Sequence, residues 1–263
     1  MWMALAGVGL QLFFVARIAA MAVVAPESTA FMRSEAWRTA ADRMGSNTQR
    51  PWASEWVSYD QISPNLKRAV MASEDAGFTE HGGVDWDAIQ AAWTKNEQRQ
   101  QLAEKDAARR AEREARRAAR RANAGKPAPE TPPTAALEKP PKVVGGSTIT
   151  QQLAKNLFLS GERNLLRKGQ ELMLALTLEA LLSKQRILEI YLNSVEWGEG
   201  VFGAEAAAQR YFKKSASQLS AQEAARLAVM LPSPKFFETR QGSGYLARRT
   251  ATIVARMGAV QLP

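Results

Sequence analysis

The sequence predicts a mainly α-helical fold, and three observations support this. Almost no segment alternates apolar and polar residues as a half-buried strand does. Capping sequences precede segments of helical apolar periodicity, as at Thr148 and at Ser220. Apolar residues make up 46% of the 263 residues, which is enough for a substantial core.

Composition restricts the classes of partner and of chemistry. The net charge of +9 indicates an anionic partner, which is a nucleic acid, an anionic membrane surface or a phosphate-bearing substrate. The absence of cysteine excludes disulfides, thiolate chemistry and cysteine zinc sites. Because His81 is the single histidine, a metal site with several histidines is excluded as well.

Residues 1–25 are predicted to be a transmembrane anchor. Residues 2–25 are apolar apart from Gln11 and Arg17, and as a helix they span about 36 Å, against about 30 Å for a bilayer core. A cleaved signal peptide is the alternative, because the residues up to Ala25 are small enough for processing. No basic region precedes the apolar segment, so the orientation does not follow from charge.

Residues 26–60, which carry scattered tryptophans, are predicted to be a juxtamembrane segment, and residues 61–263 form the remaining domain. Ser63 followed by Pro64 predicts a helix start, and that helix ends at Glu74 and Asp75. A loop follows up to Asp85, and the next helix begins at residue 86.

An insertion at residues 95–142 contains 13 basic and 7 acidic residues, so 13 − 7 = +6 of the total charge lies there. Residues 97–122 are strong helix formers with few apolar side chains, which predicts a solvated helix or charged disorder. Residues 125–142 are a proline-rich spacer. Because no aromatic residues are interleaved with the arginines, anionic lipid is favoured over nucleic acid as a partner.

Residues 145–171 carry the densest pattern of polar side chains. Two glycines lead into a capping box at Thr148 and Gln151, so a helix should begin near Ile149 with free amide hydrogens suited to a phosphate. Cations lie on this helix and around the start of the next helix. Glu171 follows one turn after that start. This cationic set is Lys155, Arg163, Arg167 and Lys168.

Helices account for most of the remaining chain. Residues 171–183 are apolar nearly all round and predict a buried helix. An amphipathic helix with Ile187 and Tyr191 inward follows, and residues 197–200 are predicted to be a loop. Further helices are expected at 203–212, from Ser220 to residue 231, and at about 245–257.

The carboxylates and cations together suggest a reaction type. Glu74 with Asp75, and Glu171, suit acid–base chemistry at an acetal carbon. The cationic set suits a phosphate that is bound or expelled. Transfer of a sugar from a phosphate leaving group would use both.

Four ordered motifs resemble those of the family 51 glycosyltransferases, which are peptidoglycan glycosyltransferases. They are Glu74-Asp75-x-x-Phe78-x-x-His81-x-Gly83, Gly145 to Asn156, Arg167-Lys168-x-x-Glu171, and Ile187-Leu188-Glu189-x-Tyr191-Leu192-Asn193. Outside the insertion the resemblance covers residues 60 to 257. There is no room for a transpeptidase domain, so the resemblance implies the monofunctional type.

The resemblance implies polymerisation of lipid II into β-1,4 glycan by a lysozyme-like helical head with a smaller membrane-facing jaw. It makes Glu74 the general base and places Glu171 near the departing pyrophosphate, which the cationic set would hold. The residues expected to line the cleft are Asp75, Phe78, His81, Ser147, Gln152 and Asn156. From the residues alone, His81 is interpreted as a loop organiser, Gln151 as a cap and residues 189–193 as scaffold.

The resemblance also implies the setting of the reaction. It places the chain in the inner membrane as a single-pass protein, with the catalytic domain on the periplasmic face. The expected partners are lipid II, the growing glycan chain, the bilayer and cell-wall synthesis proteins, and no nucleic acid. No cofactor is required, no metal ligands are predicted, and a divalent cation (Mg²⁺ or Mn²⁺) is an optional helper in this family.

Two alternatives remain open at this point. A lysozyme-like hydrolase would also suit a helical fold with a catalytic glutamate, but a neutral glycan leaving group needs no cationic set. A membrane-tethered adaptor that uses its arginine-rich insertion would leave the ordered motifs unexplained.

Overall fold

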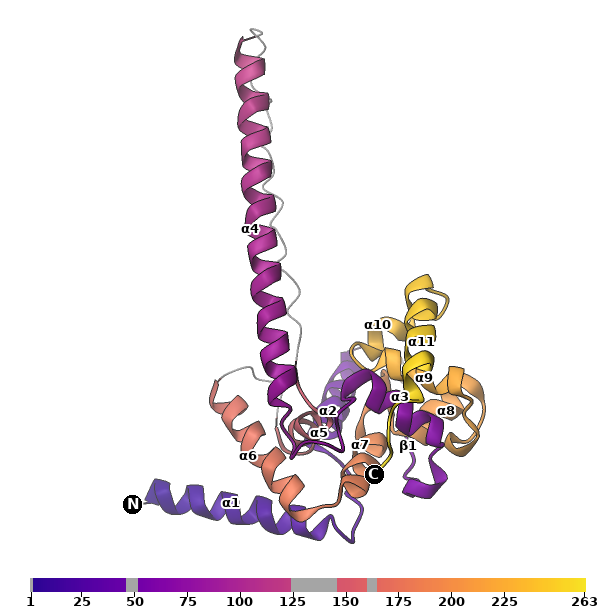
Figure 1. The fold of residues 1–263 in the computed structure, drawn as a ribbon. Helices are drawn as coiled ribbons and strands as arrows, with labels where there is room; N and C mark the ends of the chain where they lie inside the picture. Colours follow the sequence, from indigo (N-terminus) through magenta and orange to yellow (C-terminus); the bar gives the residue numbers. More distant parts are fainter. Residues whose placement is uncertain (1, 46–51, 124–145, 160–164) are drawn as a thin grey trace. The chain divides into compact units, whose positions relative to one another are not determined.

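A computed structural model describes residues 2–45, 52–123, 146–159 and 165–263. The chain divides into two compact units, of which the first comprises residues 1–85 with 147–263 and the second residues 86–146. The prediction of a mainly helical fold is confirmed (Figure 1). The α-helices are α1 (Trp2–Ala20), α2 (Ala30–Gly45), α3 (Pro64–Glu74), α4 (Trp86–Asn123), α5 (Ile149–Phe158), α6 (Leu165–Leu181), α7 (Lys184–Ser194), α8 (Ala204–Phe212), α9 (Ala221–Met230), α10 (Pro234–Glu238) and α11 (Gly244–Met257).

Helix α3 begins where the sequence predicts. The Ser63 hydroxyl accepts a hydrogen bond from the amide of Asn65 at 3.2 Å, and Pro64 fills the first helical position, where no amide hydrogen is needed. The Leu66 and Val70 side chains are fully buried in the core, and α3 packs against α9 and α11. The C-terminal end of α3, which carries Glu74, therefore rests on a packed part of the first unit.

Helix α5 begins with the predicted capping box. The Thr148 hydroxyl accepts from the Gln151 amide at 3.2 Å, and the Gln151 side chain accepts from the Thr148 amide at 3.3 Å. Leu153 and Leu157 are fully buried, because α5 packs against both α6 and α7. These contacts fix the opposite face of α5, which carries the polar side chains.

A small sheet replaces part of the predicted loop at 197–200. Its strands are β1 (Ala53–Ser54), β2 (Glu196–Gly198) and β3 (Val201–Phe202), in the order β1-β3-β2. β1 runs parallel to β3, and β2 runs antiparallel to it. Strands of two or three residues are too short to show an alternating pattern, which is why the loop prediction was wrong here.

The chain needs a glycine directly after β3. Gly203 has a φ of +87°, and a Cβ at this position would lie 2.9 Å from the carbonyl oxygen of Asn193. Because both conditions exclude other residues, Gly203 lets α8 start close against the end of α7.

The N-terminal segment differs from the predicted anchor. Helix α1 ends at Ala20, not at residue 25. No helix within the described ranges combines the length and the apolar character needed to cross a bilayer, so the predicted transmembrane helix is not confirmed. Phe14 and Ile18 of α1 are buried in the core of the first unit, and α1 contacts α6.

The predicted juxtamembrane segment contains ordered structure. Residues 30–45 form α2, which the sequence did not predict because few apolar residues recur at helical spacing. The Thr29 hydroxyl accepts from the Met32 amide at 3.0 Å and so caps this helix. α2 also packs against α5, which places it beside the polar face described below.

Helix α6 is not buried all round, so that prediction was wrong. Leu174 and Leu178 lie in the core, but Met173 is 53% exposed and Leu176 is 49% exposed. An apolar sequence alone does not distinguish a helix that is enclosed from one that has an uncovered apolar side.

The second unit contains α4, a helix of 38 residues (Figure 1). The solvated helix is therefore correct for residues 97–122, and charged disorder is not. All side chains from 111 to 120 are exposed. The proline-rich spacer at 125–142 lies outside the described residues.

Candidate active site

Glu74 lies at the last position of α3 and is held by neutral hydrogen-bond donors. Its Oε2 accepts from Nε2 of Gln152 at 3.1 Å. The Tyr191 hydroxyl donates to Oε1 of Gln152 at 2.9 Å. Since the tyrosine occupies the oxygen of the amide, the NH₂ group must face Glu74. Three helices, α3, α5 and α7, thus fix the orientation of one carboxylate.

Burial raises the pKa of Glu74 above its usual value, and the neighbouring charge of Asp75 adds to this. The hydrogen bonds from Gln152 and Ser73 lower the pKa in part, but they do not cancel the effect of burial. The pKa of Tyr191 is raised by burial and by the charges of Glu74 and Asp75. Tyr191 therefore stays a neutral donor, and Glu74 has a raised affinity for protons.

A cavity of about 420 Å³ lies beside this hydrogen-bonded chain in the first unit. It collects predicted site residues from two helices, namely Gln152, Lys155 and Asn156 of α5 with Arg167 of α6. The rest of its lining comes from the end of α5, from α2 and α7, and from the segment around β2 and α10. These residues are Phe31, Ser34, Glu35, Leu159, Tyr191, Val195, Glu196, Leu231 and Pro234.

Glu171 is held by cations, as its spacing predicts. Arg167 Nη1 lies 3.4 Å from Glu171 Oε2, and Lys168 Nζ bonds the other carboxylate oxygen. The Glu171 side chain is only 5% exposed. Because Arg167 also lines the cavity, this ion-paired group borders the same space that Gln152 borders. Arg163, the remaining member of the cationic set, lies outside the described residues.

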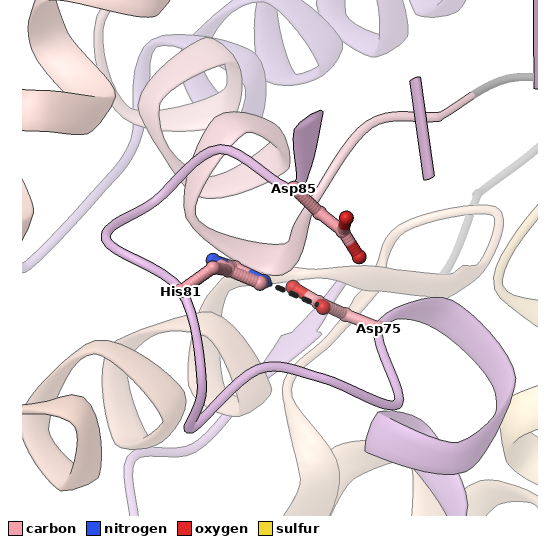
Figure 2. A group of neighbouring side chains, drawn as sticks. All are labelled: Asp75, His81 and Asp85. Atoms are coloured by element: carbon pink, nitrogen blue, oxygen red, sulfur yellow. Dashed lines mark hydrogen bonds and ion pairs between the residues drawn. The ribbon is translucent and has the colours of Figure 1, made fainter. Parts of the chain in front are cut away.

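The N-terminus of α5 does not present the free amide expected for a phosphate. The Asp75 Oδ2 accepts from the Ile149 amide at 2.9 Å, while Oδ1 pairs with Nε2 of His81 at 2.8 Å (Figure 2). An internal carboxylate, 74 residues away in the sequence, thus interacts with the positive end of the helix. A capping box locates a helix start but does not reveal which anion will occupy it, so this expectation was wrong.

His81 organises its loop, as interpreted from the sequence. The Gly83 amide donates to Nδ1 of His81 at 3.2 Å, so Nε2 carries the proton that is donated to Asp75. Gly83 itself has a φ of +86°, and a Cβ there would lie 2.7 Å from Cγ of Glu179. Lys184 Nζ donates to the His81 carbonyl at 2.6 Å. The loop is therefore tied to the end of α3 through Asp75 and to α7 through Lys184.

Phe78 was expected to line the cleft, and the structure corrects this. Its ring is fully buried in the core, 4.4 Å from Nζ of Lys184. Asp75 and His81 likewise support the loop and are not part of the cavity lining. Ser147 is exposed, directly before α5. These four residues are thus arranged around the loop and helix start that hold Glu74 and α5 in place.

Sequence reasoning missed several contributors. Tyr191 was expected only as an inward core residue, and no local signal shows that its hydroxyl meets Gln152. Glu196, a buried side chain of the cavity lining, pairs with Lys235 at 3.5 Å, and burial raises its pKa to about 7. Asp85 lies beside Asp75 and His81, with ligand atoms within 4.8 Å of one another (Figure 2).

A half-buried carboxylate beside a cavity that includes Lys155 and Arg167 suits an enzyme that transfers a group from an anionic leaving group. The chain belongs to the transglycosylase family, whose model, described as "Transglycosylase", matches residues 40–105 and 134–258. The gap between the matched ranges falls inside the predicted insertion.

Two relatives are similar over nearly the whole chain. A "Biosynthetic peptidoglycan transglycosylase" of Paraburkholderia xenovorans (strain LB400) is 48% identical over 260 residues, which is 99% of this chain and 90% of the relative. A protein of the same name in Burkholderia thailandensis is 48% identical over 271 residues, covering 100% of this chain and 88% of the relative. These matches confirm the resemblance drawn from the four motifs.

Proposed function

We propose that this enzyme polymerises lipid II into linear β-1,4 peptidoglycan strands and releases undecaprenyl pyrophosphate, with Glu74 as the general base. The observation that supports this most directly is the chain Glu74–Gln152–Tyr191 beside a cavity that also contains Lys155 and Arg167. Glu74 thus reaches, through Gln152, a cavity that Lys155 and Arg167 line.

In the proposed reaction, Glu74 takes the proton of the acceptor sugar hydroxyl as its oxygen attacks the anomeric carbon of the donor. The bond between that carbon and the pyrophosphate oxygen breaks, and the electron pair leaves with the pyrophosphate. Lys155, Arg167 and Lys168 balance the charge that develops there. Glu171 holds Arg167 and Lys168 in position by pairing with both. Arg163 is proposed to join them.

The environment of Glu74 suits a general base. Catalysis by a base is most effective when its pKa lies close to the working pH. Burial shifts the pKa of Glu74 upward, in that direction. The fixed amide of Gln152 bonds one carboxylate oxygen. The other oxygen, which among the described residues has only the weak 3.4 Å contact from the Ser73 hydroxyl, is left for the substrate.

The test is polymerisation by the purified full-length chain. Lipid II should be converted to glycan, and cell-wall glycan in a parallel incubation should stay intact. Glu80→Gln, on the exposed loop after Glu74, is the matched control and should behave as the unmodified chain does. Cleavage of the glycan with no consumption of lipid II would favour the hydrolase and overturn the proposal.

We also infer attachment to the inner membrane, with the catalytic domain on its periplasmic face. Support comes from apolar side chains that are exposed along α1 and along one side of α6, including Leu5, Leu12, Phe13, Met173 and Leu176. On this proposal they belong to the membrane-facing jaw, and the helices around α3 and α9 form the lysozyme-like head. Recovery of the chain in the membrane fraction tests attachment, and recovery without membranes or detergent would contradict it.

A divalent cation is left out of the proposed reaction. Asp75, His81 and Asp85 offer ligand atoms within 4.8 Å of one another. However, Nε2 of His81 carries a proton toward Asp75, because Nδ1 accepts from Gly83. Asp75 also receives the Ile149 amide. The group as arranged serves as a hydrogen-bond relay and does not fit a cation site.

A further inference from the structure

The segment of α4 at residues 107–120 has two chemically distinct faces. At 100° per residue, the six arginines between residues 107 and 120 fall within an arc of about 120°. The six alanines of the same segment fall within the opposite arc of about 120°. Glu112 and Glu114 lie at the two borders. The arginines, here called the arginine face, are Arg109, Arg110, Arg113, Arg116, Arg117 and Arg120.

The arginine face differs from the preceding part of the same helix. Residues 95–106 contain three basic and three acidic side chains, so 3 − 3 = 0. Residues 107–120 contain six basic and two acidic side chains, so 6 − 2 = +4. Both parts are largely exposed, so the difference does not come from burial.

This clustering is unfavourable for a helix that only meets water. Arg109 and Arg113, Arg113 and Arg117, and Arg116 and Arg120 are separated by four residues, where like charges repel. One ion pair of this segment joins Glu112 and Arg116 at 2.6 Å, and Glu112 lies at the border of the arginine face. A solvated helix is better served by the mixed charges of residues 95–106. An anionic partner would offset the repulsion.

We propose that the arginine face binds the anionic headgroups of a phospholipid membrane. The inference rests on the membrane attachment proposed above. A helix that docks into a protein groove needs large apolar anchors, and the opposite face offers only alanine. Sequence-tolerant binding of single-stranded nucleic acid uses aromatic stacking, which residues 107–120 lack. A charged surface of headgroups requires neither.

The opposite face, here called the alanine face, also determines the depth of binding. It consists of Ala107, Ala108, Ala111, Ala115, Ala118 and Ala119. Helices that insert between lipids carry tryptophan, phenylalanine or leucine on the buried side. Alanine buries too little apolar area for this. Helix α4 is therefore expected to lie on the headgroups and to dissociate in high salt, since screening acts on exposed charges.

The experiment uses the full chain in vesicles, with one dye on α4 and an acceptor on the lipid headgroups. Because the sequence has no cysteine, Ala115→Cys gives a unique labelling site in the alanine face. Energy transfer should be high with phosphatidylglycerol in the vesicles, low in pure phosphatidylcholine, and reduced by salt. Equal transfer in both lipids would overturn the proposal.

A rearranged variant provides the matched control. It exchanges residues within the helix, so that composition and net charge stay the same while three arginines leave the face. The exchanges are Arg109→Ala, Arg113→Ala, Arg117→Ala, Ala108→Arg, Ala111→Arg and Ala118→Arg. At about fivefold per arginine, the surface-bound state should weaken about a hundredfold. Undiminished binding would show that net charge, and not the face, is responsible.

Two further measurements separate the outcomes. Replacing all six arginines by glutamine should abolish the lipid response while circular dichroism still shows the helix. Polymerisation of lipid II in the same vesicles reports on the proposed function independently. An enzyme that polymerises lipid II but shows no lipid response of α4 would contradict this inference and leave the proposed function intact. If α4 binds an oligonucleotide and does not bind anionic vesicles, its partner is a nucleic acid and the lipid proposal is wrong.

Discussion

Glu74 and Glu171 each reach the cavity through one neighbouring side chain, Gln152 and Arg167 respectively, but their partners differ in charge. Glu74 is held by an amide and a hydroxyl, both neutral. Glu171 is held by an arginine and a lysine. Neutral donors orient a carboxylate and leave its affinity for protons raised by burial. Cations instead form ion pairs with the carboxylate, as Arg167 and Lys168 do with Glu171. The comparison supports the proposal that Glu74 transfers the proton and that Glu171 supports the leaving-group side.

The strongest test of this division is Glu74→Gln. General-base catalysis is typically worth about 10² to 10⁴ in rate, so turnover should fall by that factor while lipid II still binds. Initial rates and lipid II affinity measure the two effects separately. Glu171→Gln should weaken both binding and rate, yet retain more activity. A Glu74→Gln enzyme with near-normal turnover would reverse the two roles.

Removing a cation from the other side should have a smaller effect. Lys155→Ala or Arg167→Ala is expected to reduce kcat/KM about tenfold to a hundredfold, because a charge-assisted bond is worth about 1.5 to 3 kcal/mol. Lys213→Ala, at an exposed position after α8, serves as the control. Full activity in both cavity variants would remove the cations from the reaction.

Glu196 sharpens the comparison because it combines burial with a nearby cation. Its folded-state pKa of about 7 lies above the ordinary glutamate value of 4.5. The native state therefore holds the proton more tightly than the unfolded state, and stability falls as pH rises from 4.5 to about 7. Glu196→Gln should remove this slope and stabilise the protein at pH above 7 by about 2 kcal/mol, allowing for solvent screening.

Urea unfolding of Glu196→Gln at several pH values measures this difference. Lys235 keeps its ion pair with Glu35 at 2.6 Å in the variant, so little new charge is left buried. If the dependence of stability on pH is the same in the variant, Glu196 does not cause it. The ion pair with Lys235 would then offset the effect of burial on the pKa of Glu196.

Tyr191→Phe tests whether neutral orientation matters. The variant loses the hydrogen bond that fixes the Gln152 amide, which is worth about 1 kcal/mol. Activity should fall about fivefold, with affinity for lipid II nearly unchanged. Normal kcat in this variant would show that Glu74 needs no fixed amide. Thermal unfolding provides the control for loss of core packing.

The smallest effect is expected from the second unit. Glu74 and Glu171 both belong to the first unit, so replacing residues 97–141 by a Gly/Ser linker should leave the fold and polymerisation intact. Circular dichroism and product gels check this. Unfolding of the deletion variant would mean that the first unit depends on the second.

The sequence predicted those features that depend on local spacing. The caps at Ser63, Thr148 and Ser220, and the pairing of Arg167 with Glu171, all act within a few residues. Long-range partners were not predictable in this way. The Asp75 carboxylate at α5 and the hydroxyl of Tyr191 at Gln152 depend on how helices pack, which no local pattern specifies.

The sequence also did not predict which apolar side chains are exposed. From the apolar composition of α6 and α1, we expected α6 to be buried and α1 to be inserted in a membrane. The exposure of their side chains depends instead on which side of each helix the neighbouring helices cover. The residues predicted to line the cleft include Phe78, which its motif brings close to Glu74 in sequence, but packing directs the ring into the core.

Within the first unit, the segments before residue 86 and after residue 146 are bonded to each other. The Thr148 hydroxyl donates to the Gly83 carbonyl at 2.6 Å, and Asp75 bonds the Ile149 amide, so the chain leaves and re-enters the first unit at one fastened point. For a flexible loop between fixed ends, doubling its length costs only about 0.6 kcal/mol. This junction can therefore accept segments of very different length, and a reporter domain inserted after residue 123 should leave the polymerase intact.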